Sequence, residues 1–161
     1  MNMSTLAEDW DKLRSSIKDG LFNYTIPDYA EDRLNDPEFD FKKPIRIGVI
    51  GDPFLNQYRN VVRSVATFLN FFGVSNFIIV TGDRNGAERT VIKACETNNI
   101  QCAVLKYRDE ETDNQLDRRI LERSDVVLIL EHAKSTRDFS KTIKKARDCG
   151  LVVEKRILRK P

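Results

Sequence analysis

Short apolar runs alternate with longer amphipathic stretches along the chain from residue 45 onward. Five runs are rich in β-branched residues and nearly continuous in apolar side chains: residues 45–50, 77–80, 102–106, 125–130 and 151–155. Strands of this kind are typical of parallel sheets that are covered on both faces. Because strands that alternate with amphipathic helices form βαβ units, the pattern predicts an α/β fold with a mainly parallel five-stranded sheet.

The stretches between these runs have apolar residues at helical spacing, which places them on one face of each predicted helix. The expected buried positions are Val61, Val62, Val65, Phe68, Leu69 and Phe72 in a first helix, Ala87, Val91, Ala94 and Cys95 in a second, Leu116, Ile120 and Leu121 in a third, and Phe139, Ile143 and Ala146 in a last helix after Thr136. Gly73 and Gly150 follow the first and last helices, where glycine commonly ends a helix. We therefore expect a Rossmann-like three-layer sandwich over residues 44–161.

The first 43 residues follow a different pattern. Leu6, Trp10, Leu13 and Ile17 have helical spacing and Gly20 follows them, which predicts a short amphipathic helix. Beyond it, aromatic residues are interspersed with prolines and acidic residues, as in an irregular arm. We interpret residues 1–43 as an N-terminal helical and irregular extension, which either covers part of the core or contacts a partner such as a second copy of the chain.

Composition supports one globular domain. Of the 161 residues, 40% are hydrophobic and 32% are charged, which suits a single core beneath a charged surface. No apolar run approaches the roughly 20 residues of a membrane helix, and the N-terminus is unlike a signal peptide, so we expect a cytoplasmic protein without a membrane partner. Cys95, Cys102 and Cys149 lack the spacing of a metal site, and we expect free thiols, no metal and no cofactor.

A net charge of +2 conceals an asymmetry along the chain. Residues 1–43 carry 6 basic and 10 acidic side chains, whereas residues 132–161 carry 10 basic and 3 acidic ones. This sorting suits mutual docking, plain solvation or an anionic partner. On the last helix, Arg137, Lys141, Lys144 and Lys145 lie opposite the predicted apolar face, as a solvated basic face would place them.

Three strand ends carry the candidate chemistry, and they share the rim of a parallel sheet where open α/β folds bind ligands. After the first strand, Gly51 permits a tight turn, and Asp52 would accept a sugar hydroxyl or cap a helix. After the fourth strand, Ser135 and Thr136 would cap the last helix and bind a phosphate at its N-terminus.

The second strand end is the richest of the three. Its candidate ligand-binding residues are Thr81, Gly82, Asp83, Arg84, Gly86 and Arg89. Gly82 and Gly86 would let the backbone approach a ligand, while Arg84 and Arg89 would neutralise phosphate beside a helix N-terminus. The loop is neither a Walker A loop nor a dinucleotide fingerprint, and a two-glycine turn with solvated arginines is the alternative interpretation.

Residues 77–89 resemble a motif of the SLOG superfamily, the Rossmann-like group of the LONELY GUY phosphoribohydrolases and DNA-processing protein A. Their sequence, Phe77-Ile-Ile-Val-Thr-Gly-Asp-Arg-Asn-Gly-Ala-Glu-Arg, is similar to the family's strand and its Ser-Gly-Gly-Ala-Arg-Gly-Ala-Asp-Arg loop. The resemblance covers residues 44–155 and places Ser135-Thr136 at the family's Gly-Thr position. It implies a ligand loop that contains Gly82, Gly86, Ala87 and Arg89, with Glu88 in place of an aspartate.

The chain departs from the phosphoribohydrolase pattern at the catalytic acid. The family's glutamate, three residues after its threonine, corresponds to Phe139, and the first-loop Gly-Ser-Arg reads Gly51-Asp52-Pro53. The resemblance therefore implies binding of a phosphorylated ligand without the family's hydrolytic mechanism.

These observations predict a protein that binds a nucleotide or nucleotide-derived small molecule at the carboxyl ends of the strands, as a sensor or sequestering protein. The first alternative is a hydrolase or transferase of an N-glycosidic or phosphoester bond, in which Asp52, Asp83, Glu131 or His132, the only histidine, would act as acid, base or nucleophile. Single-stranded nucleic-acid binding is the second alternative, and it ranks last because the basic residues are not interleaved with aromatic ones.

Overall fold

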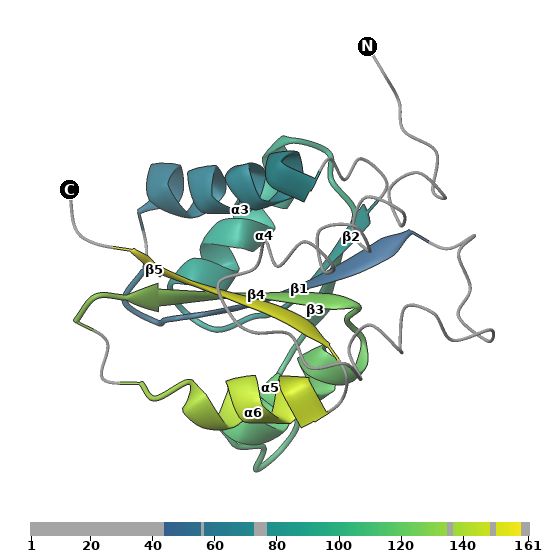
Figure 1. Cartoon of the computed structure of the whole chain (residues 1–161), viewed down its shortest axis with the longest axis vertical. Helices are drawn as coiled ribbons and strands as arrows, with labels where there is room; N and C mark the ends of the chain where they lie inside the picture. Colours follow the sequence, from purple (N-terminus) through teal and green to yellow (C-terminus); the bar gives the residue numbers. More distant parts are fainter. Residues whose placement is uncertain (1–43, 56, 73–76, 135–136, 149–150, 159–161) are drawn as a thin grey trace.

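The computed structural model has a five-stranded, all-parallel sheet at its centre with two helices on each face (Figure 1). It describes residues 44–158 except 56, 73–76, 135–136 and 149–150. The elements are β1 (Ile45–Gly51), α3 (Tyr58–Phe72), β2 (Phe77–Gly82), α4 (Ala87–Thr97), β3 (Cys102–Leu105), α5 (Asp113–Glu122), β4 (Val126–His132), α6 (Ser140–Asp148) and β5 (Val152–Leu158). The Rossmann-like α/β prediction is confirmed, while the N-terminal extension, Gly73 and Gly150 lie outside the described residues.

The strand order is β3-β2-β1-β4-β5, so the chain changes direction across the sheet once. It moves outward from β1 through β2 to β3 and then crosses to β4 on the other side of β1. Ile47 of β1 accordingly pairs with Ile79 of β2 on one side and with Val126 of β4 on the other. Such a reversal creates a topological switch point beyond the carboxyl ends of β1 and β4, where α/β folds bind ligands.

Helices α3 and α4 cover one face of the sheet, and α5 and α6 cover the other (Figure 1). Val49 and Ile50 are successive residues of β1 that enter different cores, and both are completely buried. Successive side chains of a strand point to opposite faces, so a central strand covered on both sides must be apolar at nearly every position. This explains the unbroken apolar runs in the sequence.

The ends of β4 and β5 and the start of the last helix differ from those expected. Strands β4 and β5 continue to His132 and Leu158 because pairing extends through Glu131↔Ile157 and His132↔Leu158. The last helix begins at Ser140, whose backbone N–H donates to Asp138 Oδ1 at 2.9 Å, so the expected start directly after Thr136 is too early.

Helix α5 begins with a capping box that fixes its first residue at the carboxyl edge. The Gln115 N–H donates to Thr112 Oγ1 at 3.2 Å, and the Thr112 N–H donates to Gln115 Oε1 at 2.9 Å. These reciprocal bonds satisfy two amides that a helix start otherwise leaves unpaired. Asp113, the first residue of α5, is thereby held beside the segments that follow β2 and β3.

Candidate functional site

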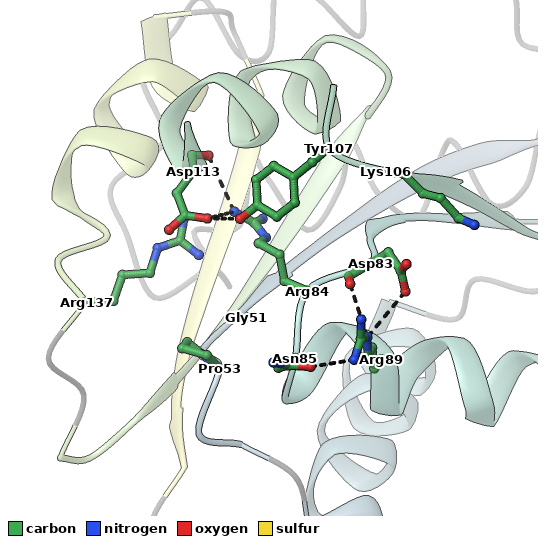
Figure 2. Close-up of a pocket in the computed structure, with 10 residues that line it drawn as sticks. All are labelled: Gly51, Pro53, Asp83, Arg84, Asn85, Arg89, Lys106, Tyr107, Asp113 and Arg137. Carbon is green, nitrogen blue, oxygen red and sulfur yellow. Dashed lines mark hydrogen bonds and ion pairs between the residues drawn. The ribbon is translucent and has the colours of Figure 1, made fainter. Parts of the chain in front are cut away.

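A cavity of about 480 Å³ opens at the carboxyl edge of the sheet (Figure 2). Its walls come from the segments after β1, β2 and β3, from the start of α5, and from the segment between β4 and α6. The lining residues are Gly51, Pro53, Asp83, Arg84, Asn85, Arg89, Lys106, Tyr107, Asp113 and Arg137. Four basic and two acidic side chains line the cavity, and two of the arginines, Arg84 and Arg137, are paired with carboxylates behind the lining.

Arg84 lies at the base of the cavity and is only 7% exposed. Its Nε and Nη2 donate to the Glu88 carboxylate at 2.9 and 2.6 Å, and Nη2 lies 2.7 Å from Asp117 Oδ1. Burial disfavours the charged guanidinium, but the hydrogen bonds and negative charges of Glu88 and Asp117 outweigh that effect and raise the pKa of Arg84. Arg84 therefore stays charged and is held in one orientation by carboxylates of α4 and α5.

The Glu88 carboxylate fills the space between the ends of β1 and β2. It is completely buried and accepts hydrogen bonds from the backbone N–H groups of Gly51 at 3.3 Å and Arg84 at 3.4 Å. Burial raises the pKa of Glu88, and the Arg84 guanidinium opposes that rise. A Cβ atom on Gly82 would lie 2.4 Å from Glu88 Oε1, so Gly82 makes room for this carboxylate.

Gly86 serves the packing of the β1 and β2 loops against each other. Its φ is +90°, and an added Cβ would lie 2.4 Å from the carbonyl oxygens of Asp52 and Pro53. The Ala87 N–H, at the start of α4, donates to Asp52 O at 3.2 Å. The close backbone approach expected at Gly82 and Gly86 is thus made by the protein itself, and neither glycine lines the cavity.

One wall combines an aromatic ring with charged groups of α5 and the β4–α6 segment. The Tyr107 hydroxyl donates to Asp113 Oδ1, and Arg84 Nη1 lies 3.4 Å from the same oxygen (Figure 2). The Tyr107 hydrogen bond, with help from nearby arginines, lowers the pKa of Asp113. Burial and the Asp113 carboxylate raise the pKa of Tyr107 to about 12. Tyr107 is therefore a neutral hydrogen-bond donor, and Asp113 is an anion, at neutral pH.

Arg137 completes this wall and so departs from the solvated basic face expected for it, whereas Lys141, Lys144 and Lys145 are exposed as expected. Its Nη2 donates to Asp117 Oδ2, which also accepts a 2.6 Å hydrogen bond from Thr142 Oγ1. The guanidinium also lies 4.6 Å from the centre of the Phe139 ring. Asp117 thus joins Arg137 to Arg84, and two cavity arginines share one buried carboxylate.

The opposite wall contains Arg89 and Lys106, which together have fewer carboxylate partners than Arg84 and Arg137. Arg89 is exposed; it donates to Asp83 O at 3.2 Å and to Asn85 Oδ1 at 2.5 Å, and lies 3.5 Å from Asp83 Oδ1 (Figure 2). Within the part of the chain that the structure describes, the Lys106 ammonium has no hydrogen bond or ion pair. This end of the cavity therefore offers the positive charge that an added anion can reach most directly.

The structure brings four of the predicted ligand-binding residues to the cavity: Gly51, Asp83, Arg84 and Arg89. Asp52 is buried instead, and its carboxylate accepts a hydrogen bond from the Phe54 N–H at 2.9 Å within the turn that follows β1. Thr81 donates to Val49 O at 2.8 Å within the sheet. Ser135 and Thr136 lie outside the described residues.

Among the candidate catalytic residues, only Asp83 lines the cavity. Glu131 and His132 belong to β4: Glu131 forms a 3.2 Å ion pair with Lys155, and His132 Nδ1 accepts a hydrogen bond from the Lys134 N–H at 2.9 Å. Phe139, at the family's glutamate position, is 2% exposed and packs in the core beside α5 and α6.

Six lining residues were not among those that the sequence pattern predicted: Pro53, Asn85, Lys106, Tyr107, Asp113 and Arg137. Lys106 and Tyr107 follow β3, whose carboxyl end shares the rim with the other strand ends, so topology alone could have identified them. Asp113 directly follows Thr112, the first residue of a capping box whose sequence pattern is recognisable in advance.

The described residues contain no group of three or more histidine, cysteine or acidic side chains placed to hold a metal ion. Nor do they include a helix with the length and apolar character needed to cross a bilayer. No family model, curated protein or solved structure matches the chain.

Proposed function

We propose that the protein binds a nucleotide or nucleotide-derived small molecule in this cavity, as a sensor or sequestering protein. The supporting observation is the combination of four cationic side chains with an accessible aromatic ring in a cavity of about 480 Å³ at the carboxyl edge of a parallel sheet. Such cavities, with a few convergent polar groups, are typical of small-molecule sites.

The phosphate would bind between Arg89 and Lys106. Arg89 is 58% exposed at its side chain, and the Lys106 ammonium has no ionic partner within the described residues, so an incoming phosphate need not displace a buried ion pair. Arg84 contributes differently, because Glu88 and Asp117 already occupy its donors at 2.6–2.9 Å. Its role is to hold the cavity wall in place.

The rest of a nucleotide would use the aromatic and acidic groups. Tyr107 is 48% exposed, and its hydroxyl is fixed by Asp113, so one face of the ring can stack on a base. The carboxylates of Asp83 and Asp113 can accept hydrogen bonds from sugar hydroxyls, as acidic residues at strand ends do in dinucleotide-binding folds.

A screen of nucleotides, cyclic nucleotides and ADP-ribose derivatives by thermal shift, with mass spectrometry of molecules released from the purified protein, tests the proposal. A ligand of the native state raises the melting temperature by mass action. Lys106→Gln is expected to weaken that shift. Arg108→Gln, two residues away at an exposed position outside the cavity lining, should preserve it. No stabilising or copurified nucleotide, or equal shifts in both variants, would contradict the proposal.

A hydrolase or transferase acting on a nucleotide is the second candidate, because Asp83 lies in the cavity beside Arg89. Recovery of free base or phosphate, lost in Asp83→Asn, would favour this alternative over simple binding. The cytoplasmic location, the homo-oligomer and the SLOG relationship expected from the sequence stay predictions.

A further inference from the structure

A second cavity, with apolar walls, lies between α3 and α4, on the face of the sheet that these two helices cover. Its volume is about 240 Å³, and its lining residues are Val62, Val65, Ala66, Leu69, Phe77, Ile79, Val91, Ala94, Cys95, Asn98 and Ile100. We refer to it as the α3–α4 groove. All of these side chains except Asn98 are apolar, Ala66 is exposed, and Val62, Val65, Leu69 and Ala94 are only half-buried. Apolar surface gathered in a groove is stabilised when another segment covers it.

We propose that residues 6–17 of the same chain dock in the α3–α4 groove. The N-terminal extension joins the described structure close to this groove. Pro44 precedes Ile45, the first residue of β1, and Ile45 pairs with Phe77 of β2, which lines the groove. The N-terminal extension therefore meets the domain beside one end of the groove.

Chain length allows this docking. Residues 18–44 separate the segment from β1, and a stretch of that length spans roughly 90 Å when fully extended. A folded chain of this size has a radius of gyration of roughly 15 Å. The segment can therefore reach any part of the groove without strain on β1.

Side-chain chemistry on the two partners is complementary. Leu6, Trp10, Leu13 and Ile17 supply an apolar stripe at helical spacing, which is the pattern that helix-in-groove recognition uses. The polar positions between them include an acidic cluster at residues 8, 9 and 11.

Helix α3 offers the matching charge. Its only charged residues are Arg59 and Arg63, and both are exposed. In sequence, Arg63 lies between the groove residues Val62 and Val65. Docking would thus bring apolar residues of the segment against apolar residues of the groove, and its acidic residues near the basic residues of α3. An acidic surface would repel the acidic extension instead.

Trp10 makes the proposal testable in the full-length protein, because it is the only tryptophan in the chain. Its emission maximum and its quenching by acrylamide report on the N-terminal segment alone. In the native chain we expect blue-shifted emission and protection from quenching relative to the urea-unfolded chain. Ala66→Glu, which puts a charge into the groove, should remove both the blue shift and the protection.

Thr67→Glu is the matched control, since Thr67 is also exposed on α3 but does not line the groove, and it should leave Trp10 unchanged. From the side of the segment, Leu13→Asp should expose Trp10 and Lys12→Asp, on the opposite helical face, should not. Far-UV circular dichroism and thermal melting establish that each variant is folded.

Three results would overturn the proposal. Native Trp10 emission equal to that of the unfolded chain would mean that the segment is undocked. Protection that survives both Ala66→Glu and Leu13→Asp would place the segment elsewhere. Protection that appears only as the concentration rises, together with a dimeric mass by light scattering, would assign the groove to a second copy of the chain.

Discussion

At the scale of single residues, the buried Arg84 guanidinium dominates the candidate site. It is paired with Glu88 of α4 and Asp117 of α5, and Asp117 also pairs with Arg137. Buried charges are tolerated only when they are paired, and the loss of one partner leaves the other charge uncompensated. Each member of this network therefore stabilises the fold, whether or not it also contacts a ligand.

The first prediction concerns Glu88. Glu88→Ala should lower the free energy of unfolding by about 3–5 kcal/mol, because it leaves the Arg84 guanidinium buried with one carboxylate fewer. The measurement is chemical denaturation at neutral pH. Glu96→Ala, at an exposed position on the same helix, is the control and should change stability by less than about 0.5 kcal/mol. Equal effects of the two substitutions would show that the Arg84 pair contributes nothing to folding.

The second prediction concerns the thiols of Cys95 and Cys102. The Cys95 thiol donates a hydrogen bond to Cys102, which lowers the pKa of Cys102, while Cys95 itself has a raised pKa. Because a lowered pKa means more thiolate at a given pH, the reaction of Cys102 with iodoacetamide should reach half its maximal rate at a lower pH than an unperturbed thiol does.

Peptide mapping in a Cys149→Ser background separates Cys102 from the other thiols. Cys95→Ala should move the pH profile of Cys102 to higher pH, because the thiolate loses its donor. An unchanged profile in Cys95→Ala would refute the role of this hydrogen bond.

At the scale of elements, the loops after β1 and β2 behave as one unit. Gly86 lies at φ +90° against the carbonyl oxygens of Asp52 and Pro53, and the Ala87 N–H donates to Asp52 O. Since Gly51 and Pro53 line the cavity on one loop and Asp83 to Asn85 on the other, the cavity shape depends on this contact.

The third prediction follows from that contact. Gly86→Ala should destabilise the protein by about 1–3 kcal/mol, because a non-glycine residue is strained at this φ, and the added methyl group meets backbone oxygens. It should also weaken any ligand of the cavity. Glu96→Ala, at an exposed position on α4 away from the cavity lining, serves as the stability control in the same thermal melts. A Gly86→Ala protein as stable as Glu96→Ala would contradict the loop packing.

The presence of each described helix and strand could be predicted from the sequence, but the exact ends of these elements and the contacts of the loops could not. The run at 45–50 is apolar at nearly every position because β1 is buried on both faces, and this local signal suffices to find the strand. The extension of β4 to His132 depends on its pairing with Leu158, which lies far along the chain. The roles of Gly82 and Gly86 also depend on partners from other segments, so a glycine pattern alone suggested a ligand.

At the scale of the whole molecule, strand order determines which residues share the cavity. Arg84 and Arg89 could be predicted because they follow a strand within a recognisable loop. Arg137 could not, since its helical spacing suggested solvent and only the packing of α6 on α5 brings it to Asp117. Tyr107 similarly joins the site because β3 lies beside β2.

The fourth prediction concerns the order in which the strands unfold. Strands β1 and β4 are central and buried, whereas β3 is a short edge strand with exposed Ala103 and Val104. Backbone amides of β1 and β4 should therefore exchange with deuterium only through global unfolding, and those of β3 should exchange through smaller openings. Native-state hydrogen exchange in increasing denaturant distinguishes these routes. Equal opening free energies for β1 and β3 would contradict this order.

The carboxylate of Asp117, shared between Arg84 and Arg137, also restricts how this protein can evolve. A lineage that loses the acid at position 117 removes a carboxylate that Arg84 and Arg137 share, and a lineage that loses Arg84 leaves the buried Glu88 carboxylate without its guanidinium partner. Each single substitution gives a destabilised protein, whereas simultaneous replacement of the charged residues by apolar ones does not. Positions 84, 88, 117 and 137 should therefore be inherited together or replaced together.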